Sequence, residues 1–339
     1  MNQSNVVAID AMSGDGGTGV VVEAVRLVLE RRKDAHLLLV GQPDVIEQHI
    51  GSAPLPTDRF TIVPAEEVVT MDDTAAIALR NKKQSSMRVA INQVKEGTAG
   101  ACVSAGNTGA LMAISKFVLK TVPGIDRPAI STTIPAIDGH THMLDLGANV
   151  DCTAEQLFQF AAMGSILAQA IDSVDAPRVG LLNIGSEDIK GNEQVREAAK
   201  LLSSAPFNYI GFVEGNEIYT DNVDVVVCDG FVGNVSLKTS EGVARMVSHY
   251  LKEEFKRNWW NKLVGLFAKP VLQAFGNRID PRLYNGASLL GLQGVVIKSH
   301  GHADAFAFAN AIEIALLEIA IDVPSMIAER LRGEPATAA

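Results

Sequence analysis

The sequence predicts an α/β protein of three layers, with one mixed, mostly parallel sheet between two layers of helices. Apolar strand-like runs alternate with helical runs along most of the chain, which is typical of β-α units. Several of these strand-like runs end directly in turns rich in Gly and Asn. One pair of strands is joined by a turn too short for a crossover helix, so the sheet is expected to be mixed.

The first part of the chain is expected to supply strands that are each followed by a helix. The strands are expected at residues 6–9, 36–40, 59–64 and 101–104. The helices that follow them are expected at 20–33, 44–49, about 74–96 and 109–119. This regular order favours a sheet covered by helices on both faces.

The second part of the chain begins with an expected hairpin of strands 129–134 and 142–145, around the turn Ile137-Asp138-Gly139-His140. Further strands are expected at 179–183, 209–213 and 223–228, with helices at 153–172, 193–203 and 237–254. The apolar run 305–323 contains Asn310, Glu313 and Glu318, so it predicts a core helix and not a membrane span.

Composition narrows the class of protein. A chain of 339 residues, 47% hydrophobic and 20% charged, predicts a globular protein with two domains or subdomains. Its net charge of −10 argues against generic nucleic-acid binding. The N-terminus lacks a basic region, so no signal peptide is expected. Cys102, Cys152 and Cys228 show no CxxC spacing and are expected to be buried, reduced thiols of a cytoplasmic protein.

Four turns that follow strands are the best indication of a ligand site. Such turns leave unpaired backbone N–H groups at the start of a helix, where the helix dipole favours phosphate or another small oxyanion. On one parallel sheet they would share a carboxyl-end edge, where open α/β sheets bind ligands. The turns are Ser104-Ala105-Gly106-Asn107-Thr108-Gly109, Gly147-Ala148-Asn149-Val150-Asp151, Asn183-Ile184-Gly185-Ser186-Glu187-Asp188 and Asp229-Gly230-Phe231-Val232-Gly233-Asn234.

Two lysines lie where they can add charge to such a site. Lys190 follows the third turn and precedes a helix, and Lys298 ends an apolar strand just before a Gly turn. A lysine on its own is most often a solvated surface charge. Two lysines together with several helix N-termini near one edge predict a site for a doubly charged anion.

Two short motifs predict cofactor sites less well. The stretch from Gly14 to Gly19 matches GxGxxG, but Asp15 stands where a pyrophosphate would sit and no acid follows the second strand to hold a ribose. A dinucleotide site is therefore disfavoured. The stretch His300-Gly301-His302-Ala303-Asp304 resembles the start of metallo-hydrolase sites but has no later His, and His140 and His142 form the only other close pair. We therefore predict no metal and no organic cofactor.

Residues 243–275 interrupt the alternation and predict two amphipathic helices in succession. Between Lys252 and Arg282 there are seven basic and three acidic residues, a local net charge of +4. One interpretation is a membrane-surface anchor, in which aromatic rings lie at headgroup depth and bases meet anionic lipid. The other is a dimer interface or a subdomain core helix. The expected membrane contacts are Trp259, Trp260, Leu263, Leu266 and Phe267.

The longest motifs of the chain are the stretches 84–90, 101–110, 144–152, 182–185 and 228–235, and 284–287 through 298–301. Together they resemble PlsX, the bacterial phosphate acyltransferase family of phospholipid synthesis. The resemblance covers about residues 6–324. One departure is at the start, where the family usually reads Met-Gly-Gly-Asp with a Pro a few residues on. Here Ser13 stands in place of the first of these glycines, and the following stretch Gly16-Gly17-Thr18-Gly19 has no Pro.

The resemblance implies transfer of a fatty acyl group from acyl-[acyl carrier protein] to inorganic phosphate. It implies a single unit over residues 1–339, made of two intertwined subdomains like those of phosphotransacetylases and isocitrate-type dehydrogenases, with a protruding helical segment at 243–282. It also implies a homodimer. An acyl phosphate is labile and its chain is insoluble, so we expect a cytoplasmic enzyme at the inner face of the membrane. There it would pass its product to the membrane glycerol-phosphate acyltransferase.

The expected site residues follow from these turns and lysines. We expect phosphate on the turns that contain Ser104, Gly106, Asn107 and Thr108 and Asp229, Gly233 and Asn234. Lys190, with Asn183 nearby, is expected to bind phosphate or to steady the tetrahedral oxyanion, while Lys298 and His300 are expected to orient or neutralise the second reactant. Two rival functions are a nucleotide-dependent dehydrogenase of similar fold and a non-catalytic membrane-tethered scaffold.

Overall fold

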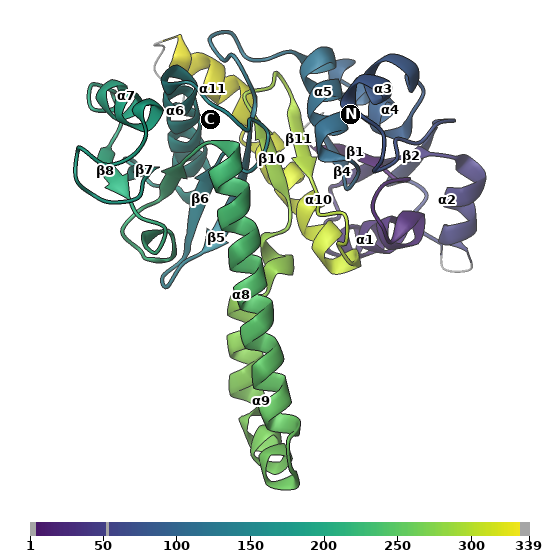
Figure 1. Ribbon diagram of the computed structural model, residues 1–339. Helices are drawn as coiled ribbons and strands as arrows, with labels where there is room; N and C mark the ends of the chain where they lie inside the picture. Colours follow the sequence, from purple (N-terminus) through teal and green to yellow (C-terminus); the bar gives the residue numbers. More distant parts are fainter. Residues whose placement is uncertain (1–4, 52–53, 333–339) are drawn as a thin grey trace.

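The computed structural model describes residues 5–51 and 54–332 (Figure 1). Its strands form one 11-stranded sheet in the order β3-β2-β1-β4-β11-β10-β5-β6-β9-β7-β8. Helices cover both faces of this sheet (Figure 1). Most neighbouring pairs are parallel and three are antiparallel, β11–β10, β10–β5 and β5–β6. The predicted three-layer architecture with a mixed, mostly parallel sheet is confirmed.

The N-terminal elements follow the predicted order. One predicted helix, 74–96, is in fact two helices, because the backbone leaves the helical region at Lys82 and the side chain of Ser85 caps a new helix by accepting from Arg88 N–H. The elements are β1 (Val6–Asp10), α1 (Gly17–Arg31), β2 (His36–Gly41), α2 (Pro43–Ile50), β3 (Phe60–Pro64), α3 (Ala75–Asn81), α4 (Ser86–Lys95), β4 (Ala101–Ser104) and α5 (Thr108–Leu119).

The predicted hairpin is confirmed. Strands β5 and β6 pair antiparallel, and Ala136 N–H donates to the carbonyl of Gly139 at 3.1 Å across the turn. The elements of this part are β5 (Ala129–Pro135), β6 (His140–Leu144), α6 (Ala154–Asp172), β7 (Val179–Leu182), α7 (Glu193–Leu202), β8 (Tyr209–Val213), the short 3-10 helix η2 (Glu217–Tyr219) and β9 (Val225–Val227).

The last part of the chain contains the longest helices. Helix α8 (Gly230–Lys256) begins seven residues before the predicted 237, because the side chain of Asp229 caps it by accepting from Val232 N–H. Helices α8 and α9 (Trp259–Ile279) pack together and project from the body of the protein as a helical pair (Figure 1). The remaining elements are η3 (Pro281–Tyr284), β10 (Ala287–Leu290), β11 (Val295–Lys298), α10 (Ala305–Ala320) and α11 (Val323–Leu331).

Strand direction corrects the prediction of one ligand edge. Strand β4 is parallel to β11, and β5 points the same way because two antiparallel pairings separate it from β11. Strand β6 is antiparallel to β5, and β9 and β7 are parallel to β6. The turn at 104–109 therefore lies at one end of the sheet, and the turns at 147–151, 183–188 and 229–234 lie at the other. The prediction of one shared edge is therefore right for these three turns. It is wrong for the turn at 104–109, which lies at the opposite end of the sheet.

The apolar interior is built from three clusters of buried residues. One lies between α1, α10 and the strands β1, β2, β4 and β11, and the second includes residues of α4 and α5. The third joins α6, α7 and α11 to β6, β7 and β9. Strand β11 and helix α10 belong to the C-terminal part of the chain, yet their side chains pack in the first cluster with those of the N-terminal elements. The two intertwined subdomains stay a prediction, which this return of the chain supports.

Candidate functional site

The loops after β1, β4 and β11 pack against one another at one end of the sheet. We call residues 10–15, 104–109 and 298–302 the N-half loop cluster. Ser104 Oγ donates to Asp10 Oδ2 at 2.7 Å and accepts from Gly106 N–H at 3.1 Å. Ser13 Oγ accepts from Ala105 N–H at 3.0 Å, and burial raises the pKa of Asp10. These bonds fix the shape of the turn that was expected to hold phosphate.

The predicted phosphate residues of this turn have specific local roles. Ser104 is fully buried, so its hydroxyl stabilises the loop from inside the protein and does not face solvent. Asn107 caps α5 by accepting from Ala110 N–H at 3.0 Å, and its amide donates to the carbonyls of Met71 and Asp73. Thr108 is the first residue of α5. A Cβ at Gly106 would lie 2.6 Å from the methyl of Met87, so the turn is tightly packed there.

Three basic side chains gather at the N-half loop cluster. Lys298 Nζ lies 3.4 Å from the carbonyl oxygen of Ala105. Lys238, from the third turn of α8, places its Nζ 3.3 Å from His300 Nε2. Burial, followed by the charge of Lys238, lowers the pKa of Lys298 to about 8. The same two causes lower the pKa of His300. Lys238 is itself half-exposed and pairs with Glu241 at 2.8 Å, so that carboxylate offsets part of the positive charge.

Lys238 Nζ and His300 Nε2 lie 3.3 Å apart, and the tautomer of His300 sets the character of this contact. His300 Nδ1 lies 3.2 Å from the backbone N–H of His302 and accepts from it. The ring proton of neutral His300 is then on Nε2, which points at an ammonium group that can only donate. An anionic oxygen between them would accept from both. In the structure the anionic partner of Lys238 is Glu241, at 2.8 Å, so a phosphate bound here would compete with that carboxylate.

A second group of turns lies at the other end of the sheet. Asp145, fully buried, accepts from the backbone N–H of Ile130, Ala148 and Asn149 and from the amide of Asn149, at 2.6–3.1 Å. Gly230 N–H donates to the carbonyl of Asn149 at 2.8 Å, which joins the turn after β6 to the turn after β9. Burial raises the pKa of Asp145 despite these bonds.

The predicted phosphate residues after β9 serve mainly the packing of α8. Asp229 caps the helix, so a carboxylate already occupies the place where a phosphate would meet its N-terminus. A Cβ at Gly233 would lie 1.8 Å from the carbonyl oxygen of Asp145, so only glycine lets the helix approach so closely. Asn234 is exposed and lies beside Gly147.

Lys190 and Asn183 both lie in the turn that follows β7. Lys190 is exposed and its side chain lies over Gly185. Asn183 Oδ1 accepts from Ile184 N–H at 2.9 Å, while its Nδ2 is buried and has no partner among the described residues. An unpartnered buried donor is costly, which marks this amide as available to an acceptor. The pair belongs to the second group of turns and not to the N-half loop cluster.

Helix α8 connects the two groups of residues. It begins at Gly230, which is bonded to Asn149, and reaches His300 at Lys238. Eight residues of α-helix span about 12 Å. No motif in the sequence points to Lys238, because it is one exposed lysine within a long amphipathic helix. The fold alone brings it to His300.

Comparison with known proteins identifies the family. Residues 5–326 match the family described as fatty acid synthesis protein. Relatives include the phosphate acyltransferase of Alkalilimnicola ehrlichii, 58% identical over 337 residues with 98% of each chain covered. The phosphate acyltransferase of Methylococcus capsulatus is 59% identical over 326 residues, with 96% of each chain covered. The chain belongs to the PlsX family of phosphate acyltransferases.

Solved structures of other families share the PlsX fold. A phosphotransacetylase from Streptococcus pyogenes superposes with a TM-score of 0.65 at 16% identity, covering 94% of this chain and 95% of its own. The EutD phosphotransacetylase from Staphylococcus aureus gives a TM-score of 0.60 at 14% identity, covering 93% and 94%. At these identities the likeness concerns the fold alone.

The two weaker motifs of this PlsX-family chain have structural roles. Asp15 of the GxGxxG stretch forms an ion pair with His302 Nδ1. Asp304 caps α10 by accepting from Ala307 N–H at 2.8 Å and pairs with Arg282 at 3.0 Å. Asp15, His302 and Asp304 are thus engaged in these contacts. The three cysteines are free and buried as predicted, and burial raises the pKa of each thiol.

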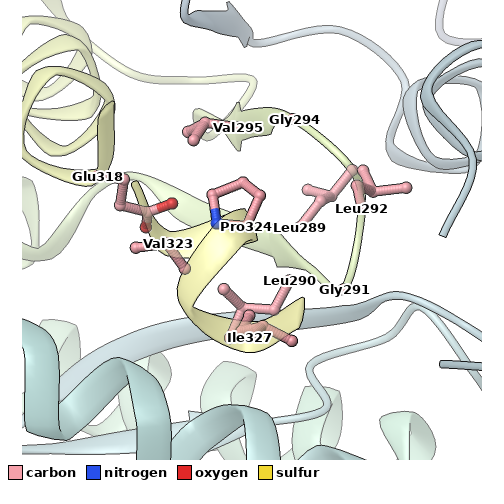
Figure 2. A pocket seen from close by; sticks show the side chains of 10 residues that line it. All are labelled: Leu289, Leu290, Gly291, Leu292, Gly294, Val295, Glu318, Val323, Pro324 and Ile327. Atoms are coloured by element: carbon pink, nitrogen blue, oxygen red, sulfur yellow. The ribbon is translucent and has the colours of Figure 1, made fainter. Parts of the chain in front are cut away.

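One pocket lies away from both groups of turns (Figure 2). It holds about 10 Å³ between β10, α10 and α11. Glu318 lies at its wall, where Ser288 Oγ donates to its carboxylate. Burial raises the pKa of Glu318 to about 7. The space is too small for more than about one water molecule, so we assign it to core packing.

The α8–α9 pair exposes many large apolar side chains. Phe267 is 78% exposed and Trp259 is 64% exposed. The rings of Trp259 and Trp260 stack with centroids 4.0 Å apart. Among the described residues, no helix combines the length and apolar character needed to cross a bilayer. The other exposed large apolar residues of the pair are Phe231, Val232, Val235, Val243, Met246, Val247, Tyr250, Leu251, Trp260, Leu263, Val264, Leu266, Val271 and Phe275.

Proposed function

We propose that this protein transfers a fatty acyl group from acyl-[acyl carrier protein] to inorganic phosphate, giving acyl phosphate for phospholipid synthesis. Its relatives at 58–59% identity are phosphate acyltransferases, and the alignments cover nearly the whole chain. In the reaction a phosphate oxygen forms a bond to the thioester carbonyl carbon and the carbon–sulfur bond breaks. The proton of hydrogen phosphate ends on the carrier thiol, so no cofactor enters the balance.

The proposed phosphate site rests mainly on the short distance between Lys238 and His300. Both groups present hydrogen-bond donors at 3.3 Å, and Lys298 adds a second ammonium to the same loops. A phosphate dianion accepts several hydrogen bonds and removes the repulsion between these groups. We therefore place phosphate against Lys238, Lys298 and His300. This revises the expected roles of Lys298 and His300, which the sequence assigned to the second reactant.

The chemical step needs positioning more than proton transfer. Phosphate at neutral pH is already an anionic nucleophile and a thiolate leaves readily, so orientation and stabilisation of the oxyanion dominate. We propose that the unpartnered amide of Asn183 and the ammonium of Lys190 serve the acyl-thioester side of the reaction. The caps Asn107 and Asp229 and the close contact at Gly233 hold the turns in place.

The test of this function is release of carrier thiol. Acyl-[acyl carrier protein] is incubated with the protein with and without phosphate, free thiol is measured, and acyl phosphate is trapped with hydroxylamine. Phosphate-dependent release is expected, whereas no release contradicts the enzyme and favours the scaffold. Lys238→Ala should raise the KM for phosphate at least tenfold. Lys252→Ala, a lysine farther along the same helix, is the matched control and should leave it unchanged.

We further propose that the α8–α9 pair binds the inner face of the membrane. Its apolar rings and aliphatic side chains are exposed, and the segment from Lys252 to Arg282 carries a net charge of +4. An interfacial helix buries such side chains at the headgroup boundary while its bases meet anionic lipid. This position would let the enzyme pass acyl phosphate to the membrane glycerol-phosphate acyltransferase.

Vesicle pelleting distinguishes the membrane from a second copy of the chain. The protein is expected to pellet with anionic liposomes, and Trp259→Ala/Trp260→Ala is expected to remain in the supernatant. Phe117→Ala, which removes an exposed aromatic ring from α5, is the control and should still pellet. If the double variant pellets normally but sediments as a smaller species than the wild type, the pair is a homodimer interface instead.

A further inference from the structure

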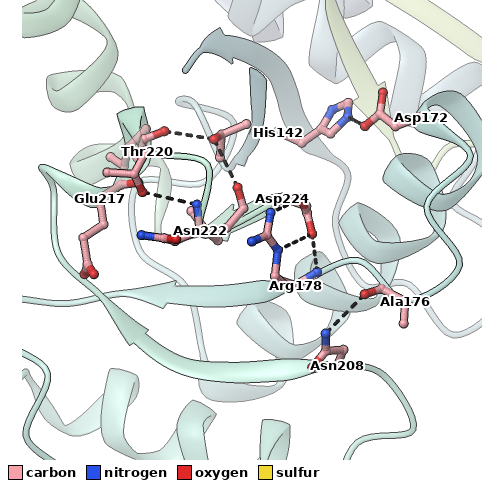
Figure 3. Close-up of polar contacts among 12 residues, drawn as sticks. His142, Asp172, Ala176, Arg178, Asn208, Glu217, Thr220, Asn222 and Asp224 are labelled. Carbon is pink, nitrogen blue, oxygen red and sulfur yellow. Dashed lines mark hydrogen bonds and ion pairs between the residues drawn. The ribbon is translucent and has the colours of Figure 1, made fainter. Parts of the chain in front are cut away.

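A group of potential metal ligands lies away from both groups of turns. His140 and His142 stand on the same face of β6, because side chains two residues apart in a strand point the same way. Asp172, the last residue of α6, faces them. His140 Nε2 lies 3.0 Å from Asp172 Oδ1, and His142 Nε2 lies 2.7 Å from Asp172 Oδ2. Figure 3 shows the contact between His142 and Asp172.

The arrangement of these atoms suits a small divalent cation. The two Nε2 atoms and a carboxylate oxygen all lie within 4.8 Å of one another. Ligand atoms around tetrahedral zinc, bound at about 2.0–2.2 Å, are separated by roughly 3.3–3.5 Å. A bound ion would lengthen the two imidazole–carboxylate contacts by roughly 0.3–0.8 Å and would draw together those ligand atoms that now lie up to 4.8 Å apart.

The surroundings favour a cation that can enter from solvent. His142 is buried, whereas His140 is partly exposed and leaves a path to the ligand atoms. The last turn of α6 contains no basic residue, so its carbonyl ends have no side-chain cation to offset their partial negative charge. The neighbouring Asp224 is paired with Arg178 at 2.8 Å, whereas the carboxylate of Asp172 contacts the two imidazoles.

We propose that His140, His142 and Asp172 bind one zinc-class divalent cation, with at least one coordination position open to water. Two imidazoles and one carboxylate are the donor set that zinc accepts in proteins. The site lies at the start of β6, whereas the turn at 147–151 follows the end of that strand. The ion would therefore tie the β5–β6 hairpin to α6 and take no part in acyl transfer. The sequence offered only the His-x-His pair; Asp172 joins it through the fold.

The test uses ZnCl₂ as the probe on the full chain after treatment with a chelator, in a phosphate-free buffer. Titration calorimetry should show one site per chain, and the midpoint of thermal unfolding should rise when zinc is added. Co²⁺ in place of zinc should give the visible absorption of a low-symmetry site.

Substitutions assign the ligands. His140→Ala and Asp172→Asn should each weaken zinc binding at least tenfold, with circular dichroism to confirm that the variants are folded. His302→Ala is the matched control, since His302 belongs to the other His-x-His pair of the chain and should bind zinc like the wild type. Binding that survives His140→Ala, or no binding at all, would overturn the proposal and leave a hydrogen-bonded clamp of Asp172 between two imidazoles.

Discussion

Gly233 is the residue at which the approach of α8 to the sheet can be tested most directly. A Cβ built there lies 1.8 Å from the carbonyl oxygen of Asp145 and 3.0 Å from Cys228 Sγ. An ordinary contact begins near 3.4 Å, so Gly233→Ala must push α8 away from β6 by about 1.6 Å. The atom it meets belongs to the backbone at the end of a core strand, which does not yield as a flexible side chain would.

The cost follows from what this movement disrupts. Overpacking of this kind costs about 1–3 kcal/mol, and the bond from Gly230 N–H to Asn149 is worth about 1 kcal/mol more. We expect Gly233→Ala to lower the free energy of unfolding by about 2–4 kcal/mol. The shift also moves Lys238 relative to His300. A misplacement of about 1 Å can cost roughly 100-fold in rate.

Urea denaturation and phosphate-dependent thiol release measure these two effects. Gly242→Ala is the matched control, because it lies in the same helix and a Cβ there meets nothing within 4 Å. It should stabilise the protein by about 0.5–1 kcal/mol through helix propensity and leave turnover unchanged. If Gly233→Ala is as stable and as active as Gly242→Ala, the close approach of α8 to β6 is not what positions the site.

Four further predictions follow from individual side chains. Since the pKa of Lys298 is about 8, its charge is lost above that pH; the KM for phosphate should rise there in the wild type and stay flat to higher pH in Lys298→Arg. Lys190→Ala should lower turnover at saturating phosphate at least threefold, about 0.7 kcal/mol, and a smaller fall contradicts its proposed role. Asp145→Asn should cost about 2–3 kcal/mol in urea unfolding, because an amide N–H₂ then faces the N–H donors of Asn149. Glu318 keeps its proton in the folded protein up to about pH 7 but loses it near pH 4.5 in the unfolded chain. The free energy of unfolding should therefore fall by about 3 kcal/mol as the pH rises from about 4.5 to about 7. The same fall in a Glu318→Gln variant would contradict this cause.

The local elements of the fold were predictable because each depends on neighbours in sequence. Strand β4 and helix α5 were placed to within a residue, since an apolar run ends at Ser104 and Asn107 then caps a helix. The β5–β6 hairpin was predictable from a turn too short for any other connection. The start of α8 was not, because the cap is Asp229 and the predicted helix was read from apolar spacing seven residues later.

The candidate site was only partly predictable, because its geometry depends on strand direction and on contacts between distant segments. Consecutive residues are enough to encode the Gly-Asn turns, the basic residues Lys298 and His300 and the apolar helical pair, so the sequence predicts all three. Tertiary structure alone decided that the reversal at β5–β6 places the turn at 104–109 opposite the other three. It also brought Lys238 to His300 and Asp172 to His140, pairs that are 62 and 32 residues apart in the chain. Packing of helices against the sheet sets such pairs, and no pattern of neighbouring residues encodes them.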